Sequence, residues 1–152
     1  MDAAARTKRS FEHWIVLAGA FLGLALFLVL AWFVAPDPRG YGTHEKLGLP
    51  ACAMMKWLHV PCPGCGVTTS VTLAAHGRVL DAVRTQPFGV VVAIAIPLAA
   101  LWALLGHFRG RDLYRDLNAV RLAPWLWVIG GALALSWIYK LVSVLAPRFT
   151  AR

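Results

Sequence analysis

Three cysteines form the residue pattern in this sequence that most clearly suggests chemistry. Cys62 and Cys65 are separated by Pro63 and Gly64, and nine residues separate Cys52 from Cys62. Two cysteines at the first spacing can close a small disulfide ring or bind one metal ion. A helix is predicted directly after the motif, and the positive end of its dipole lowers the pKa of a nearby cysteine. The motif is therefore predicted to favour nucleophilic thiolate sulfur.

The residues alone leave three interpretations of these cysteines open. In thiol-disulfide exchange, Cys62 attacks, Cys65 resolves, and Cys52 is a third thiol available for a transient pair. In metal binding, the three cysteines supply three ligands, and the fourth is a histidine chosen from His59, His76 and His44, although the second CxxC pair of a zinc ribbon is absent. In a purely structural role, the motif is a turn or a disulfide staple. No particular cofactor is identified by any of the three.

A polar stripe continues from the motif along the helix predicted over residues 66–76. Cys65, Thr69, Thr72 and His76 recur at steps of four, three and four, which places them on one helix face. The surrounding residues are mainly apolar, so the stripe is predicted to face a common site. The alternative is that these hydroxyls bond carbonyls of their own helix, as threonines in membrane helices often do.

The elements that must position these residues are dominated by apolar blocks. Of the 152 residues, 59% are hydrophobic and 14% are charged, which lies outside the usual range of soluble domains. Blocks at 14–35, 88–108 and 124–145 are each long enough to cross the hydrocarbon layer. Lys140 interrupts the third block and is expected to extend its stem toward the interface. The predicted fold class is an all-α integral membrane protein with three transmembrane helices, forming a single domain over 1–152.

Shorter elements are predicted between these spans. The motif loop and helix, about 52–77, are too short to cross a membrane and are predicted to be re-entrant or interfacial. Residues 36–50 are rich in glycine and proline and indicate an irregular loop, and residues 51–60 allow one or two helical turns. Residues 78–86 and 109–121 have the pattern of small amphipathic helices at the membrane surface. Asp81, Asp112 and Asp116 stand beside arginines and are expected to form solvated ion pairs.

The basic residues predict an orientation and the class of partner. The formal net charge is +8, but the lysines and arginines flank the apolar blocks, so they favour lipid headgroups over nucleic acid. They are densest in the N-terminal tail and in the 109–123 loop, which are therefore both predicted to be cytoplasmic. The cysteine loop then lies outside, where disulfides persist. We expect a cytoplasmic membrane as the location, with the lipid bilayer and a membrane protein as partners.

Residues 44–105 resemble a bacterial domain-of-unknown-function family numbered 2752, which consists of small membrane proteins with a Cys-Pro-x-Cys-Gly-x-Thr motif. The matching residues follow in order: Leu49 and Pro50 with Cys52, then Cys62, Pro63, Cys65, Gly66 and Thr68, then the turn at Gly77, then Gln86 and Pro87 opening a span. Many members carry arginine after the threonine, where this chain has Thr69. The resemblance implies a membrane location and an important motif, but it implies no activity.

The sequence predicts an accessory envelope protein whose Cys62/Cys65 pair is reversibly oxidised. The alternative is a non-enzymatic membrane binding or assembly module in which the motif is a turn, a staple or a metal site. If the protein is an enzyme, it is predicted to be a thiol-disulfide oxidoreductase. The sequence has no phosphate-binding loop, paired buried carboxylates or serine elbow, so a kinase or hydrolase is not expected.

Overall fold

The computed structural model describes residues 9–150, with side chains to residue 145, and every regular element among them is helical. In chain order these elements are α1 (Phe11–Trp32), the 3₁₀ helix η1 (Thr43–Leu47), α2 (Ala53–Trp57), α3 (Val67–Ala75), α4 (Val79–Thr85), α5 (Pro87–Phe108), α6 (Leu113–Ala119) and α7 (Leu122–Thr150). Three of them, α1, α5 and the Leu122–Leu145 part of α7, are long and apolar enough to cross a membrane. The all-α prediction with three spans is confirmed.

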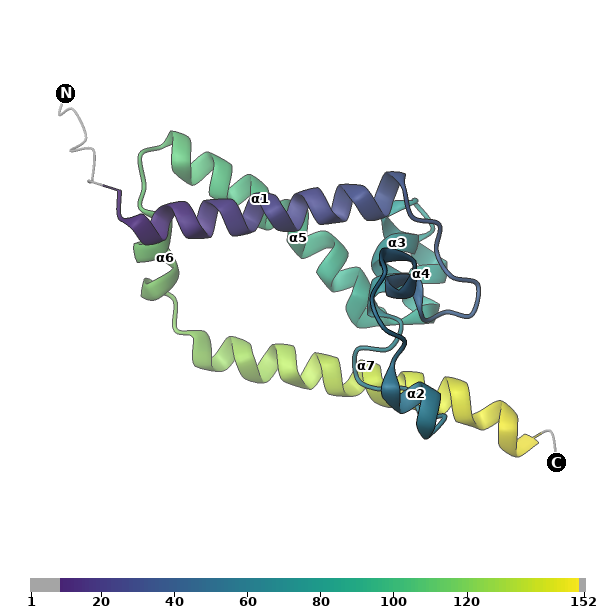
Figure 1. Ribbon diagram of the computed structural model, residues 1–152. Helices are drawn as coiled ribbons and strands as arrows, with labels where there is room; N and C mark the ends of the chain where they lie inside the picture. The colour runs from purple at the N-terminus through teal and green to yellow at the C-terminus, as the bar shows by residue number, and fades with distance from the viewer. Residues whose placement is uncertain (1–8, 151–152) are drawn as a thin grey trace, which may run out of the picture.

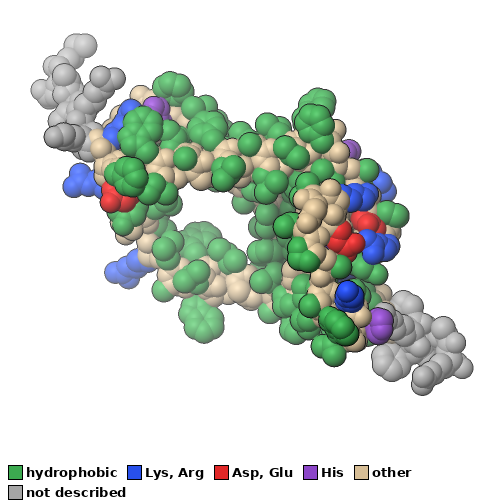
Figure 2. Space-filling model, in the orientation of Figure 1, with side chains coloured by type: hydrophobic (Ala, Val, Ile, Leu, Met, Phe, Trp, Pro, Cys, Tyr) green, Lys and Arg blue, Asp and Glu red, His purple; other side chains and the backbone are tan. Residues whose placement is uncertain are grey.

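The two ends of the molecule are polar and the surface between them is apolar. α1 and α5 pack together in opposite directions, and α7 runs along the other side of the molecule (Figure 1). α6 lies where α1 begins, and we call this the α6 end. α2, α3 and α4 lie at the opposite end, which we call the motif end. Charged side chains gather at these two ends (Figure 2).

The apolar surface of the spans faces outward. No more than 22% of the residues in the most apolar part of any span are buried. Leu22 is 72% exposed and Trp127 is 84% exposed. Leaving a large apolar side chain in water instead of burying it costs about 1.5–3 kcal/mol. A surface with many such side chains is compatible with an integral membrane protein, because lipid removes that cost.

A small core lies at the motif end, where α3 packs against α1 and α5. Leu30 of α1, Val34, Val71 of α3 and Ala93 of α5 form its buried centre. This apolar contact holds the short motif helix against the two spans. Figure 1 shows α3 and α4 as a cap over the ends of α1 and α5, which agrees with a motif helix that does not itself cross the membrane.

Several predicted boundaries shift by a few residues, and one loop prediction is wrong. α1 begins before residue 14 because the Ser10 side chain accepts a hydrogen bond from the backbone N–H of His13 and caps the helix. Residues 36–50 include the helix η1, which lies between Gly42 and Gly48, both in the left-handed conformation. α5 continues through Pro97 as one helix. The short helices predicted within 51–60, 78–86 and 109–121 are present as α2, α4 and α6.

Buried polar groups join α1, α5 and α6 at the α6 end. The prediction that Asp112 is a solvated ion pair is wrong: its side chain caps α6, and Oδ2 accepts the Ser10 N–H at 2.9 Å. His13 is fully buried, and its Nδ1 accepts the Leu113 N–H. His13 Nε2 lies 3.1 Å from His107 Nδ1. These contacts fix the start of the first span against the loop that follows the second.

α7 is held mainly by hydrogen bonds at the motif end. Ser136 Oγ accepts the Phe88 N–H at 3.0 Å, and Tyr139 OH donates to Arg84 O at 3.0 Å. Toward the α6 end, side chains of α7 are exposed, and an opening separates this part of the helix from α1 and α5 (Figure 2). Polar contacts, more than an apolar seam, therefore place α7 in this structure.

Substitution of Gly89 tests the close approach of α5 to α3. A Cβ at this position would stand 2.5 Å from Ser70 Cβ and 2.9 Å from Val67 O, and the backbone atom cannot move aside cheaply. We expect Gly89→Ala to lower the free energy of unfolding by about 1–3 kcal/mol, measured by thermal unfolding in detergent. Gly130→Ala is the matched control, because nothing lies within 4 Å of the added Cβ. Equal melting temperatures for the two variants would contradict the described packing.

Candidate functional site

The structure brings the three cysteine sulfurs into one group at the motif end. Cys65 Sγ lies 3.3 Å from Cys62 Sγ and 3.4 Å from Cys52 Sγ, and all three sulfurs lie within 4.8 Å of one another. The cysteines are free thiols. With these distances, the angle that the Cys62 and Cys52 sulfurs make at the Cys65 sulfur is at most about a right angle. The three sulfurs therefore form a triangle and not a line. In residues 9–145, no histidine or carboxylate joins this group.

A tight turn positions Cys62 and Cys65 just before α3. The Cys65 N–H donates to Cys62 O at 2.9 Å, and the Val67 N–H donates to Gly64 O at 3.1 Å. Gly66 follows with a φ of 89°, in the left-handed region that favours glycine. A Cβ on Gly66 would also stand 2.8 Å from Gly40 O. Gly66 is thus required both by its backbone conformation and by the close approach of the 33–42 loop.

Cys52 reaches the group from the start of α2 and adjoins an open cavity. The cavity has a volume of about 240 Å³, and its charged lining comes from Arg39, Glu45 and Lys56. Arg39 is itself paired with Asp37 and Glu45. Cys65, in contrast, is buried, with 5% of its surface exposed. A small molecule in the cavity therefore meets Cys52 directly.

Lys140 of α7 brings a buried positive charge to the same region. Its Nζ donates to Gly40 O and to Thr85 O, both at 3.1 Å, and only 5% of the residue is exposed. The ammonium lies 3.3 Å from the position that a Cβ on Gly66, the residue after Cys65, would occupy. From the sequence, this side chain was expected to extend toward the membrane interface, and its contacts with Gly40 O and Thr85 O were not predicted. Lys140 is a candidate site residue that the sequence pattern missed.

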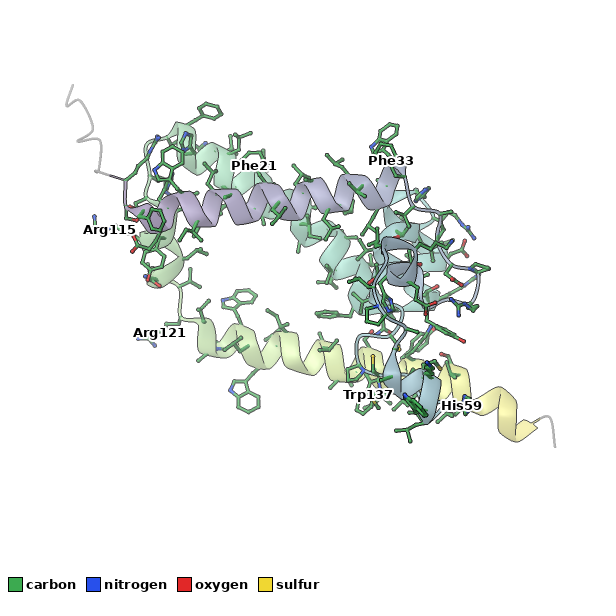
Figure 3. All side chains as sticks on the ribbon, viewed as in Figure 1. Phe21, Phe33, His59, Arg115, Arg121 and Trp137 are labelled. Carbon is green, nitrogen blue, oxygen red and sulfur yellow. The ribbon has the colours of Figure 1, made fainter. Side chains whose placement is uncertain are left out.

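Trp137 also contacts the motif from α7. Its Nε1 donates to Pro61 O at 2.9 Å, one residue before Cys62 (Figure 3). A tryptophan near the end of a span is typical of the aromatic belt at the membrane surface. The sequence therefore gave no reason to predict that Trp137 contacts the motif.

The thiols of Cys65 and Cys52 differ in acidity. Burial raises the pKa of Cys65 to about 12, and hydrogen bonding with the other two thiols acts in the same direction. Burial also opposes ionisation of Cys52, but the Met55 N–H and the neighbouring thiols stabilise its thiolate and lower the pKa of Cys52. Cys52 therefore ionises more readily than Cys65. For Cys65 the predicted stabilisation of thiolate at a helix N-terminus is wrong, because burial outweighs it.

The predicted polar stripe shares only Cys65 with the sulfur group. Thr69 is fully buried, and its Oγ1 lies 2.8 Å from Thr43 Oγ1. Thr72 Oγ1 donates to Thr68 O, and His76 Nδ1 lies 2.8 Å from Thr72 O. Thr72 thus has the local backbone contact that the alternative interpretation predicted, and His76 also contacts a carbonyl of its own helix. A chemical role for the stripe stays a prediction.

The histidines considered as a fourth metal ligand lie outside the sulfur group. His59 follows α2 with a φ of 53° and is exposed at the outer side of the motif end (Figure 3). His44 Nε2 lies 3.2 Å from Pro50 O. In the part of the chain that the structure describes, the candidate ligand set is the three cysteines.

Alkylation rates test the difference between the thiols. We expect Cys65 to react most slowly of the three and Cys52 to react at a lower pH than Cys65, because a lowered pKa increases the thiolate fraction at a given pH. The measurement is residue-resolved mass spectrometry of the reduced protein after brief iodoacetamide treatment at increasing pH. Denatured protein is the control, in which the rates converge. Equal alkylation rates for Cys65 and Cys52 in the folded protein at neutral pH would contradict the burial of Cys65 and the difference in pKa between the two thiols.

Comparison with known proteins finds a family match for this region. Residues 52–105 match the family described as "Protein of unknown function (DUF2752)". No curated protein and no solved structure matches the chain. The matched segment begins at Cys52 and includes the sulfur group, α3, α4 and most of α5. The resemblance seen in the sequence is confirmed over residues 52–105, which are similar to the DUF2752 family.

Proposed function

We propose that this is an accessory membrane protein of the cell envelope whose Cys62/Cys65 pair is reversibly oxidised. The observation that carries the proposal is the 3.3 Å separation of the two sulfurs within a tight turn. A disulfide bond is about 2.05 Å long, so small side-chain rotations bring the two sulfurs into bonding distance. The rigid turn keeps the pair ready for repeated closing and opening.

The difference in burial supports an order of steps. Cys62 is half-buried and accessible, whereas Cys65 is buried. The Cys62 thiolate attacks one sulfur of a partner's disulfide, forms a mixed disulfide and releases the other partner sulfur as thiolate. Cys65 then attacks Cys62 Sγ, which forms the internal disulfide and releases the remaining partner thiolate. Two electrons pass from the cysteine pair to the partner, which is reduced to a dithiol.

Cys52 supports the second step as a proton acceptor. The Cys65 thiol has a raised pKa and must lose its proton before or during its attack. Its Sγ donates a hydrogen bond to Cys52 Sγ at 3.4 Å, and the pKa of Cys52 is lowered. Transfer of the proton from Cys65 to the Cys52 thiolate therefore follows an existing contact.

The proposal includes an orientation in a bacterial cytoplasmic membrane. The α6 end of the described structure carries Arg9, Arg109, Arg111, Arg115 and Arg121, on a short tail and a short loop. Short segments with dense arginine or lysine face the cytoplasm. The motif end then lies outside, where disulfide chemistry is favoured. Its exchange partner is a membrane or envelope protein that carries a redox-active disulfide.

Redox titration of the full chain in detergent tests this function. After equilibration in glutathione buffers, acid quenching and labelling of free thiols, mass spectrometry should find a Cys62–Cys65 disulfide and a free Cys52 under oxidising conditions. Reduction should restore three labelled thiols. In Cys65→Ser, Cys62 should accumulate as a mixed disulfide with glutathione, because the resolving thiol is missing.

Cys52→Ser is the matched control, because it removes one thiol but leaves the proposed pair. It should still form the Cys62–Cys65 disulfide, about 100-fold more slowly, as expected for loss of a positioned proton acceptor. A pair that stays reduced at every glutathione ratio would contradict the proposal. So would an oxidised form in which Cys52 supplies one of the bonded sulfurs.

A further inference from the structure

The geometry points to a zinc site at Cys52, Cys62 and Cys65, in which the three thiolates bind one Zn²⁺ ion and a water molecule takes the fourth position. This inference goes beyond the proposed redox cycle and does not rest on it. It concerns the fully reduced protein and all three sulfurs together. It also differs from the four-ligand site expected from the sequence, because no histidine takes part.

The triangular arrangement of the sulfurs is the first support. Tetrahedral zinc with Zn–S bonds of 2.3 Å places its sulfur ligands about 3.8 Å apart. Two of the sulfur distances here are 3.3 and 3.4 Å, and the third is at most 4.8 Å. Small rotations of the cysteine side chains therefore bring all three to bonding distance of a central ion.

The charges near the sulfurs are the second support, and they favour a divalent ion. Three thiolates would bring three negative charges to a partly buried site, which is costly without compensation. The buried Lys140 ammonium supplies one positive charge beside Gly66, the residue that follows Cys65. A Zn²⁺ ion supplies the other two, so the group becomes neutral. Copper(I), which also prefers thiolate ligands, would leave one uncompensated negative charge.

The surroundings of Cys52 account for the fourth position. The sulfur group includes no imidazole or carboxylate from residues 9–145. The cavity of about 240 Å³ beside Cys52 is wide enough for water and is lined by Arg39, Glu45 and Lys56. Zinc sites with three protein ligands keep an open position of this kind for water or an incoming molecule. The site is thus of the open type and not of the closed structural type.

Zinc binding to the reduced full-length protein tests the inference. The protein is purified in detergent without oxygen, titrated with Zn²⁺ against a chromogenic chelator, and analysed for bound metal. We expect one zinc per chain. Each of Cys52→Ser, Cys62→Ser and Cys65→Ser should weaken binding about 100-fold or more, and Lys140→Met should weaken it about tenfold, as loss of a neighbouring charge does. Met54→Leu, which removes a thioether next to Cys52, is the matched control and should bind as tightly as the wild type.

Two further measurements make the result decisive. His59→Ala should retain wild-type affinity, whereas a loss like that of the cysteine variants would overturn the open fourth position. In the wild type, one equivalent of Zn²⁺ should slow alkylation of all three cysteines together, which tests the site even if a variant does not fold. Absence of bound zinc, or protection of only Cys62 and Cys65, would overturn the inference. When a metal chelator is added to the glutathione buffers of the redox titration, failure of either proposal is visible without the other.

Discussion

The arrangement of the motif end depends on one buried ammonium group. Lys140 Nζ donates to Gly40 O and Thr85 O and so connects α7, the loop after α1 and the end of α4. Hydrogen bonds from a charged donor contribute about 1.5–3 kcal/mol each, and losing them would leave buried carbonyls unsatisfied. α7 has few apolar contacts with the other spans, so this polar attachment largely decides where it lies. It also places a positive charge beside Gly66, the residue that follows Cys65.

The sulfur group is held by a frame of close backbone contacts and buried hydroxyls. Gly66 lets the loop carrying Gly40 pass directly over the start of α3. Ser70 Oγ contacts Ala82 O and Gln86 O at 2.9 and 2.8 Å, which fixes α4 against the motif helix. Thr69 is paired with Thr43 of η1. These two hydroxyls of α3 thus connect the motif helix to η1, to α4 and to the residue before α5.

The two proposed chemistries use the same sulfurs and exclude each other at any moment. A Cys62–Cys65 disulfide removes two of the three thiolates that zinc requires, and bound zinc removes the nucleophile that begins exchange. Oxidation would therefore release the metal, and metal would protect the dithiol. Cys52 has a different part in each case: it accepts a proton in the exchange and binds zinc as a ligand in the metal site. Its position between Cys65 and an open cavity suits both parts.

The sequence by itself determined the helical elements of this protein and which of them are long and apolar enough to cross a membrane. Long uncharged runs such as 14–35 have no stable alternative to helices in lipid, and the Cys62–Cys65 spacing identifies a thiol motif before a helix. Only the tertiary structure decided which residues join that motif. Cys52 and Lys140 reach it from separate helices, and His59 stays outside it, because packing, and not spacing along the chain, brings distant side chains together. Burial likewise reversed the acidity expected for Cys65, since desolvation depends on neighbours that no local pattern encodes.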